Sequence, residues 1–328
     1  MSANPIASQE YFTQAIRVIA AMRTEIGRAF TGQAPVIDQV LAAMLAGGHV
    51  LLEGVPGLGK TLLVRAVAKT FEGQFARVQF TPDLMPADVT GHMMFDQSKQ
   101  VFITRRGPVF TNLLLADEIN RAPAKTQSAL LEVMQEGQVT IEGQPHALTP
   151  PFMVFATQNP IEQEGTYALP EAQLDRFLLK IKIDQLSGVD ENAMVKQVTA
   201  GNIGDRLRVE HINALIKAQA VVALQNIAAS IFTDDRVIDY AVRIVRATRE
   251  WSGIAVGAGP RGGIALVRAA RAAALMAERD FVVPDDVRSM ALPALRHRIT
   301  LAPDVGIEGQ DADDLLQAVL AKIEAPRK

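Results

Sequence analysis

The stretch Gly54-Val55-Pro56-Gly57-Leu58-Gly59-Lys60-Thr61 decides how the whole chain is interpreted. It follows an apolar run at residues 50–52 and precedes a helical run at residues 62–70, so it stands where a strand turns into a helix. In that context, glycines followed by Lys and Thr predict a loop whose backbone N–H groups converge on phosphate oxygens. The helix behind the loop adds its positive N-terminal end at the same point. A turn that binds nothing is the alternative, and the complete pattern in this context disfavours it.

This loop and the end of a later strand supply the residues for phosphate chemistry. Lys60 is expected to reach the β- and γ-phosphates of a nucleotide, and the Thr61 hydroxyl to ligate Mg²⁺. The apolar residues 113–116 form a predicted buried strand that delivers Asp117 and Glu118 to its carboxyl end, where open α/β sheets bind ligands. We expect Asp117 to join the Mg²⁺ shell and Glu118 to polarise the attacking water as general base. Two surface acids after a strand would be unremarkable alone, and their combination with Lys60 and Thr61 favours catalysis.

Apolar strand-like runs alternate with helical stretches through the first half of the chain. The runs lie at residues 50–52, 75–80, 109–116, 152–157 and 178–183. Such alternation predicts a parallel sheet covered by helices on both faces, the α/β class. After about residue 185 the pattern is almost entirely helical, with the clearest segments at 235–251, 263–279, 284–298 and 311–323. We therefore expect a nucleotide-binding α/β core at residues 1–186 and an all-helical domain at residues 187–328.

Two β-hairpins are expected to interrupt the core, near residues 87–106 and 137–150. In the first, Arg105 and Arg106 could touch a polyanion, although a solvated hairpin tip is the favoured interpretation. The second carries Glu136 and Glu142 and no Lys or Arg. A motor that grips nucleic acid needs cationic phosphate contacts, so nucleic-acid binding is disfavoured.

The composition of the 328-residue chain is that of an ordinary globular protein. Hydrophobic residues make up 48%, charged residues 21%, and the net charge of −3 gives no global attraction to nucleic acid. The sequence has no cysteine, which excludes disulfides and thiolate sites, and its five histidines lack metal-site spacing. No signal-peptide pattern appears, and no apolar run approaches the about 18 residues that span a bilayer. We expect a cytoplasmic protein that does not insert into membranes.

Several motifs of this chain resemble those of the MoxR family of AAA+ ATPases. They are Leu-Met-Pro-Ala-Asp-Val-Thr-Gly at 84–91, Gly-Pro-Val-Phe at 107–110, Ala-Asp-Glu-Ile-Asn-Arg-Ala-Pro at 116–123, Lys-Thr-Gln-Ser-Ala-Leu-Leu-Glu at 125–132, Met-Gln-Glu at 134–136 and Ala-Thr-Gln-Asn-Pro at 156–160. The similarity runs from about Gly32 to the end and is strongest over residues 50–180. It implies a P-loop ATPase with an α/β/α core, a C-terminal helical lid, and ATP and Mg²⁺ as cofactors.

The resemblance also implies roles for two side chains beyond the phosphate loop. Asn159, after an apolar strand, matches sensor 1, the polar residue that helps orient the attacking water. An Asn-Pro pair would also suit a strand-end turn. Arg176, within Leu-Asp-Arg-Phe, matches the arginine finger, which enters the neighbouring subunit's site and stabilises transition-state charge. A surface ion pair with Asp175 is the alternative.

Two more residues complete the nucleotide contacts that the resemblance implies. Arg261 resembles sensor 2, an arginine at the start of a lid helix that contacts the γ-phosphate. This chain has Gly259 and Gly262-Gly263 where the family more often shows Ser and then Ala. Gln33 matches the entry to the adenine pocket. The expected nucleotide-binding set is Gln33, Gly54, Val55, Pro56, Gly57, Leu58, Gly59, Lys60, Thr61, Leu62, Asp117 and Arg261.

The function implied by the resemblance is ATP hydrolysis that drives chaperone-like remodelling, assembly or metal-cofactor maturation of a protein client. Because Arg176 cannot easily reach its own site, a ring is expected, most simply a hexamer. The resemblance further implies a partner with a von Willebrand factor A domain. Arg121 is expected at the subunit seam or in a structural ion pair. Two alternatives stay open: a nucleic-acid-stimulated motor or loader, and a nucleotide-gated scaffold that binds ATP without useful turnover.

Overall fold

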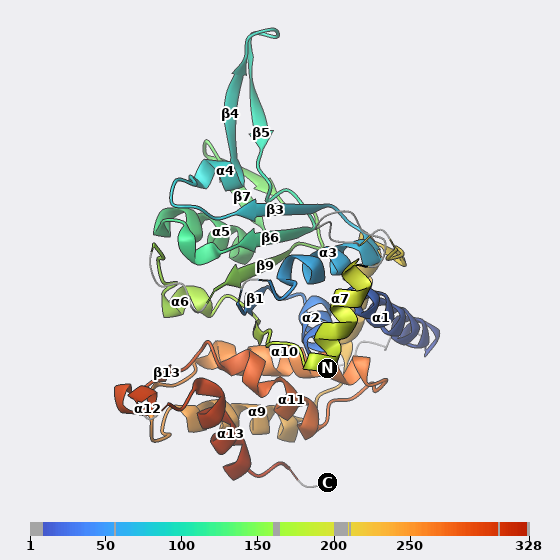
Figure 1. Cartoon of the computed structure of the whole chain (residues 1–328), viewed down its shortest axis with the longest axis vertical. Coiled ribbons are helices and arrows are strands. Elements are labelled where there is room, and N and C mark those ends of the chain that lie inside the picture. The colour runs from blue at the N-terminus through green and yellow to red at the C-terminus, as the bar shows by residue number, and fades with distance from the viewer. Residues whose placement is uncertain are drawn as a thin grey trace.

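The computed structural model describes residues 9–55, 57–159, 165–199, 209, 211–307 and 309–326. At its centre lies a five-stranded parallel sheet (Figure 1). In spatial order its strands are β10 (Leu179–Lys182), β1 (Val50–Glu53), β9 (Met153–Gln158), β6 (Leu113–Asp117) and β3 (Phe75–Gln79). The α/β class predicted from the alternating pattern is therefore confirmed, and all five carboxyl ends meet at one edge of the sheet.

The central strands are apolar because both of their faces are covered. In β6, Leu113 and Leu115 belong to one hydrophobic core, whereas Leu114 and Ala116 belong to a second core on the opposite face. Helices α1 (Gln9–Ala29), α2 (Ala34–Leu45) and α3 (Lys60–Thr70) cover the first face, and α5 (Ala124–Glu136) covers the second. Shorter elements link them: β2 (Phe71–Glu72), α4 (Pro86–Thr90), η1 (Ile119–Arg121) and α6 (Glu171–Leu174).

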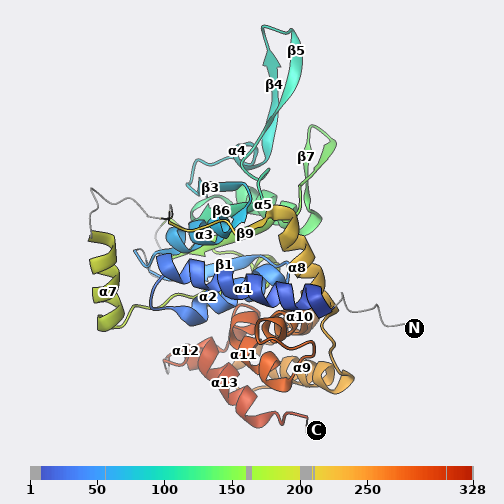
Figure 2. The same cartoon turned by 90° about the vertical axis from the view of Figure 1, so that its right-hand side faces the viewer.

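A hairpin stands at each of the two places where one was expected. Strands β4 (Gly91–Asp96) and β5 (Val101–Arg106) form a long hairpin that projects away from the sheet (Figures 1 and 2). The second consists of β7 (Gln138–Ile141) and β8 (Gln144–Ala147). Glu142 and Gly143, with φ of 47° and 77°, close the two-residue turn between them.

The C-terminal half is mainly helical, as expected, although its described residues also include three short strands. Its elements are α7 (Gly188–Thr199), β11 (Ile216–Lys217), α8 (Ala218–Ser230), α9 (Asp235–Thr248), β12 (Ile254–Val256), α10 (Pro260–Met276), α11 (Pro284–Leu295), β13 (Thr300–Leu301), α12 (Pro303–Ile307) and α13 (Ala312–Lys322). The sequence pattern did not indicate α7 or α8. Strand β11 pairs with β2 and α8 packs against α1 and α2, so residues 216–230 contact the core, and the division at residue 186 stays a prediction.

The helices after Ser230, which we call the lid, lie against the side of the sheet that carries α2 and β10 (Figure 1). Helix α10 packs on α2, and α11 packs on β10. Their starts carry ordinary capping signals, with Pro260 and Pro284 in the first turns of α10 and α11. Within the described residues, no helix is both long enough and apolar enough to cross a membrane.

Candidate functional site

The phosphate loop connects the carboxyl end of β1 to the start of α3. A Cβ at Gly54 would lie 2.7 Å from the carbonyl oxygen of Ile183, so no larger residue fits there. Gly57 and Gly59 have φ of 88° and 77°, the left-handed region that glycine adopts without strain. Gly59 is also the N-cap of α3, so the loop leads directly into the positive end of that helix. Pro56 lies outside the described residues.

Lys60 and Thr61 open helix α3 behind this loop. The Lys60 ammonium donates to the carbonyl oxygens of Gly54 at 2.5 Å and Val55 at 3.4 Å, so it lies over the loop itself. Leu58 and Leu62 pack their side chains against the main core, so any contact they make with a nucleotide would come from their backbone.

Asp117 is the last residue of β6 and Glu118 follows it, and both form hydrogen bonds with one hydroxyl group. Thr157 of the neighbouring strand β9 donates from Oγ1 to Asp117 Oδ1 at 2.7 Å. Thr157 Oγ1 in turn accepts a hydrogen bond from the backbone N–H of Glu118 at 2.8 Å. Arg77 on β3 binds the other Asp117 oxygen at 2.6 Å. Glu118 has a φ of 55°, a left-handed conformation that a non-glycine residue adopts only when its surroundings hold it there.

The Glu118 carboxylate is oriented by two further side chains. Gln79, at the end of β3, donates to Oε2 at 2.7 Å, and Arg121 lies 3.1 Å from the same oxygen. Arg121 therefore makes an ion pair within its own chain. Sequence reasoning missed Arg77, Gln79 and Thr157. For Gln79 and Thr157 the signal available was their place near the ends of predicted strands, since parallel pairing sets Gln79 opposite Asp117. Arg77 lies in the middle of β3 and had no such signal.

Asn159 and Gln33 lie at the same edge of the sheet as the phosphate loop. Asn159 follows β9 and is buried, with 6% of its surface exposed. Gln33 precedes α2, and its side-chain amide donates to the carbonyl oxygen of Asp184 at 3.2 Å. Asp184 adjoins Ile183, the residue that contacts Gly54. The carboxyl edge of the sheet therefore gathers both residues with Lys60, Thr61, Asp117 and Glu118.

Arg176 and Arg261 lie at the opposite edge of the sheet. Both line a cavity of about 310 Å³ together with Gly48, which precedes β1. A strand advances about 3.3 Å per residue, so the six residues from Gly48 to Gly54 set this cavity about 20 Å from the phosphate loop. The structure does not bring either arginine to the phosphate loop of its own chain. For Arg261, this argues against the expected contact with a γ-phosphate bound in its own subunit.

The segment that carries Arg176 is held by the lid. Arg298, with 3% of its side chain exposed, donates to Asp175 Oδ1 at 2.7 Å and to the Phe177 carbonyl at 2.7 Å. Arg261 lies 3.7 Å from the other Asp175 oxygen and is 53% exposed. Asp175 therefore pairs with lid arginines, and the alternative of an Arg176–Asp175 pair is not seen. The Arg176 Nε is buried without a hydrogen-bond partner among the described residues.

The donors at the carboxyl edge suit Mg²⁺ held jointly with phosphates. Among the described residues, no group of three or more His, Cys, Asp or Glu side chains could hold a metal by itself. Mg²⁺ prefers oxygen ligands and is commonly bound by one or two protein groups plus substrate phosphates and water. The Thr61 hydroxyl and the Asp117 carboxylate fit that pattern.

Comparison with known proteins agrees with this geometry. Residues 49–179 match the model of the ATPase family associated with various cellular activities (AAA), and residues 246–319 match the AAA lid domain. The chain is 44% identical over 301 residues to the protein YeaC of Bacillus subtilis (strain 168), covering 92% of each. It is 42% identical over 312 residues to Chaperone MoxR1 of Mycobacterium tuberculosis, covering 92% of this chain and 81% of that one.

Two further relatives extend the match over nearly the whole chain. Protein MoxR of Methylorubrum extorquens is 33% identical over 332 residues, covering 94% of this chain and 95% of its own. A crystal structure of a Cytophaga hutchinsonii protein has a TM-score of 0.89 and 40% identity, and the match covers 98% of both chains. Sequence, fold and the gathered phosphate-loop edge agree, and the chain belongs to the MoxR family of AAA+ ATPases.

Proposed function

We propose that this protein is a Mg²⁺-dependent ATPase that hydrolyses ATP to ADP and phosphate to drive remodelling, assembly or metal-cofactor maturation of a protein client. One observation carries the proposal. Thr157 fixes Asp117 and Glu118 together at the sheet edge that holds Lys60. A scaffold that only bound nucleotide would not need Glu118 in a strained conformation with its carboxylate oriented by Gln79.

In the proposed reaction Glu118 takes a proton from the attacking water. The water oxygen forms a bond to the γ-phosphorus while the bond from that phosphorus to the β–γ bridging oxygen breaks, which releases ADP and phosphate. Lys60 would turn from the loop carbonyls to the phosphate oxygens and balance their charge. Thr61 and Asp117 would hold Mg²⁺, which when bound supplies positive charge beside the β- and γ-phosphates. Asn159 would help orient the water.

The positions of Arg176 and Arg261 support a ring in which sites are shared between subunits. Each arginine lies across the sheet from its own phosphate loop, and the Arg176 Nε is buried without a partner among the described residues. A head-to-tail ring joins two different surfaces of the subunit, and here it would set this edge of one subunit against the phosphate loop of the next. Arg176 would then stabilise the transition state in the neighbouring site, and Arg261 would contact the same nucleotide from the lid. The proposed ring is a hexamer.

The β4–β5 hairpin favours a protein client over a nucleic acid. Its strands expose apolar side chains on both faces, with Phe102 67% exposed. Exposed apolar clusters mark interaction sites for proteins or other apolar partners, whereas a nucleic acid requires cationic contacts. At the base of the hairpin, Arg106 stacks over the Phe110 ring at 5.0 Å. The name Chaperone MoxR1 of one relative supports a remodelling role. A von Willebrand factor A domain partner belongs to the proposal through the family resemblance alone.

The proposal is tested by turnover and light scattering on the Glu118→Gln variant. We expect this change to abolish hydrolysis while ATP binding persists, because only the proton acceptor is lost. In ATP and Mg²⁺ the trapped variant should shift from one subunit to about six. Chelating Mg²⁺ should stop wild-type turnover. Undiminished turnover of Glu118→Gln would remove Glu118 from its role, and an ATP-bound particle that stays monomeric would exclude the shared site.

A further inference from the structure

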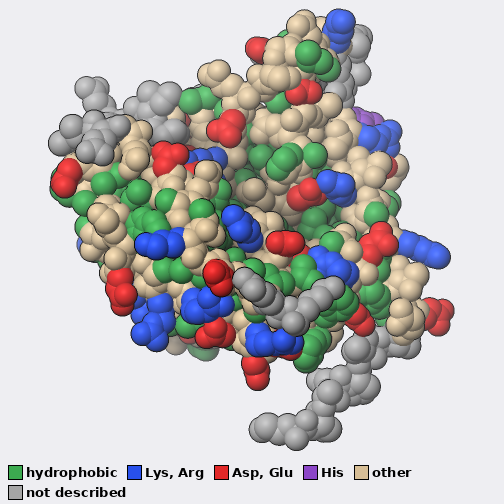
Figure 3. Space-filling model, turned by 90° about the horizontal axis from the view of Figure 1, so that it is seen from below, with side chains coloured by type: hydrophobic (Ala, Val, Ile, Leu, Met, Phe, Trp, Pro, Cys, Tyr) green, Lys and Arg blue, Asp and Glu red, His purple; other side chains and the backbone are tan. Residues whose placement is uncertain are grey.

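The lid carries an apolar groove of about 460 Å³ between helices α9 and α10. Its apolar lining comes from Ile238, Val242 and Val245 on α9 and from Ile264 and Val267 on α10. Two of these side chains are largely open to solvent, since Val242 is 42% and Ile264 58% exposed. We call this feature the α9–α10 groove. It belongs to the lid surface, where basic and acidic side chains both stand among apolar ones (Figure 3).

The charged residues that line this groove are all positive. They are Arg246 and Arg249 on α9, and Arg268 and Arg271 on α10. Three of them donate to neutral acceptors: Arg249 to the Ala258 carbonyl, Arg268 to the Ala46 carbonyl, and Arg271 to the Thr233 hydroxyl. Across the described chain, no carboxylate forms an ion pair with any of the four. An apolar groove flanked by unneutralised cations fits an apolar helix that carries acidic side chains.

The groove is continuous with the edge of the molecule that carries the two arginines described above. Ile264 and Arg268 line both the α9–α10 groove and the cavity that holds Arg176 and Arg261. A neighbouring subunit that received Arg176 at its nucleotide would therefore extend past Arg268 onto the groove. The part of the neighbouring subunit that would reach the groove is therefore an element beside that subunit's own nucleotide edge.

That element is helix α7. Asp190 of α7 lies so close to Gly32, next to Gln33, that a Cβ on Gly32 would come within 2.7 Å of the Asp190 Cβ. The helix stands away from α9 and α10 of its own chain (Figure 2). It exposes Val189 by 80% and Val195 by 48%, and its first turn carries Asp190 and Glu191. It thus offers apolar side chains that match the lining of the groove and acidic side chains that match its arginines.

We propose that the α9–α10 groove of one subunit receives helix α7 of the next subunit. The inference rests on the proposed ring. It adds a second contact between neighbouring subunits, separate from the one that Arg176 makes at the nucleotide. Such a contact is head-to-tail, since the groove and the helix lie on different edges of the same chain. It also couples lid position to the nucleotide edge of the neighbour, because α7 contacts the segment beside Gln33.

Paired cysteines test this contact directly, because the natural chain has none. Val195→Cys and Ile264→Cys, each made in the Glu118→Gln background, are mixed with ATP and Mg²⁺ and treated with a short bismaleimide. We expect a covalent dimer from the mixture and a ladder up to the full ring when one chain carries both changes. The matched control replaces Ile264→Cys by Phe281→Cys, a lid residue that is 47% exposed and lies outside the groove. That pair should not form the dimer.

Charge reversal gives a second, independent readout. Arg246→Glu should raise the protein concentration needed for half-assembly by about tenfold, since it sets like charges against the acidic start of α7. Arg243→Glu on the same helix, where Arg243 pairs with Asp239 outside the groove, is the matched control and should assemble normally. A ring that forms with ATP but gives no Val195–Ile264 dimer would overturn the docking and leave the proposed function standing. A chain that binds ATP and never assembles would overturn both.

Discussion

The hydroxyl of Thr157 links the two acidic residues of the proposed site. It donates to Asp117 and accepts from the Glu118 backbone, so Thr157→Val, which has nearly the same shape, should break both bonds. We expect turnover to fall tenfold or more while ATP affinity changes little, because the phosphate loop is untouched. Thr157→Ser, which keeps the hydroxyl, should retain activity. Equal turnover of the Val and Ser variants would contradict this role, and steady-state kinetics with a nucleotide-binding assay decides it.

The sequence predicted some residues of the proposed site and missed others. Lys60, Thr61, Asp117 and Glu118 were predicted because each belongs to a short motif in strand context, and the structure brings all four to one edge. Thr157 and Gln79 were not, because their partners come from neighbouring strands and depend on the sheet order. The residues of a motif are neighbours in the sequence and can be recognised there. The side chains that orient them come from other strands and become neighbours only in the folded sheet.

At the scale of elements, the segment before β1 is fixed by an imidazole. The Val154 N–H donates to His49 Nδ1 at 3.0 Å, so Nδ1 carries no proton and Nε2 donates to the Met134 carbonyl at 3.0 Å. Burial and the nearby Arg268 lower the pKa of His49 to about 4. Burial also lowers the pKa of His297, which contacts the Phe177 carbonyl before β10. Both histidines are therefore neutral in the folded chain near pH 7.

Folding stability should consequently fall as the pH drops below about 6.5. There the unfolded chain takes up protons on these imidazoles while the folded chain excludes them, so the free energy of unfolding decreases from pH 6.5 toward pH 4. We expect His49 alone to contribute a loss on the order of 2 kcal/mol between pH 7 and pH 5, to which His297 adds, read as a lower Tm. His49→Gln should flatten part of this dependence. A Tm that is equal for the two proteins at every pH would contradict the assignment.

The start of a helix was predicted correctly where the sequence carries a strong local signal for it. The helices starting at Asp235 and Pro284 were predicted at their observed first residues, because an acidic first turn and an N-terminal proline mark them. Helices α7 and α8 were not predicted. The α7 sequence mixes charged, polar and apolar residues without a clear stripe, and α8 is rich in small apolar residues on most sides.

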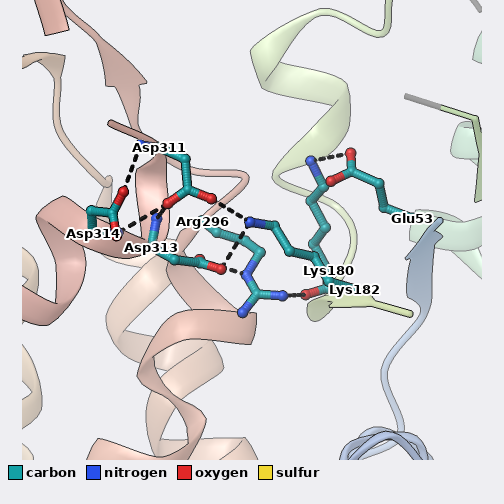
Figure 4. Close-up of polar contacts among 7 residues, drawn as sticks. All are labelled: Glu53, Lys180, Lys182, Arg296, Asp311, Asp313 and Asp314. Carbon is teal, nitrogen blue, oxygen red and sulfur yellow. Dashed lines mark hydrogen bonds and ion pairs between the residues drawn. The ribbon is translucent and has the colours of Figure 1, made fainter. Parts of the chain in front are cut away.

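At the scale of the whole molecule, a polar network joins the lid to the core strand beside β1 (Figure 4). Lys182 on β10 lies 2.7 Å from Asp311 and 2.9 Å from Asp313, and Arg296 of the lid lies 2.9 Å from Asp313. On the same strand, Lys180 pairs with Glu53 at 2.6 Å, one residue before the phosphate loop. The lid is therefore tied to the strands that carry the nucleotide edge.

Removing the central acid of this network should loosen the lid. Asp313→Ala leaves Arg296, whose side chain is 8% exposed, without its carboxylate, so we expect a loss of about 3 kcal/mol in calorimetry. Asp311→Asn is the control, because Asp311 is 54% exposed and asparagine can still cap α13. It should cost less than about 1 kcal/mol. If the two variants lose a similar free energy of unfolding, the burial of Arg296 does not determine the cost of removing its partner.

The sequence could not predict how the lid packs on the core. This packing determines at which nucleotide Arg176 and Arg261 act. The motif suggested that Arg261 contacts a γ-phosphate. It could not tell which subunit holds that phosphate, because this depends on how α10 packs on α2. Arg176 and Arg261 line one cavity beside Gly48, away from the phosphate loop of their own chain. Their predicted roles at a nucleotide therefore require a neighbouring subunit.

Mixing two inactive variants tests whether neighbouring subunits complete each other's sites. Glu118→Gln lacks the base and Arg176→Ala lacks the arginine, so each should be nearly inactive alone. In a ring of randomly mixed subunits, a site regains both groups when an Arg176→Ala chain supplies the base and its neighbour supplies Arg176. In an equal mixture, that occurs at about a quarter of the interfaces. Turnover per chain should therefore recover to about a quarter of wild type. If Arg176 acts within its own subunit, no site in the mixture is complete and turnover stays at the level of the separate variants.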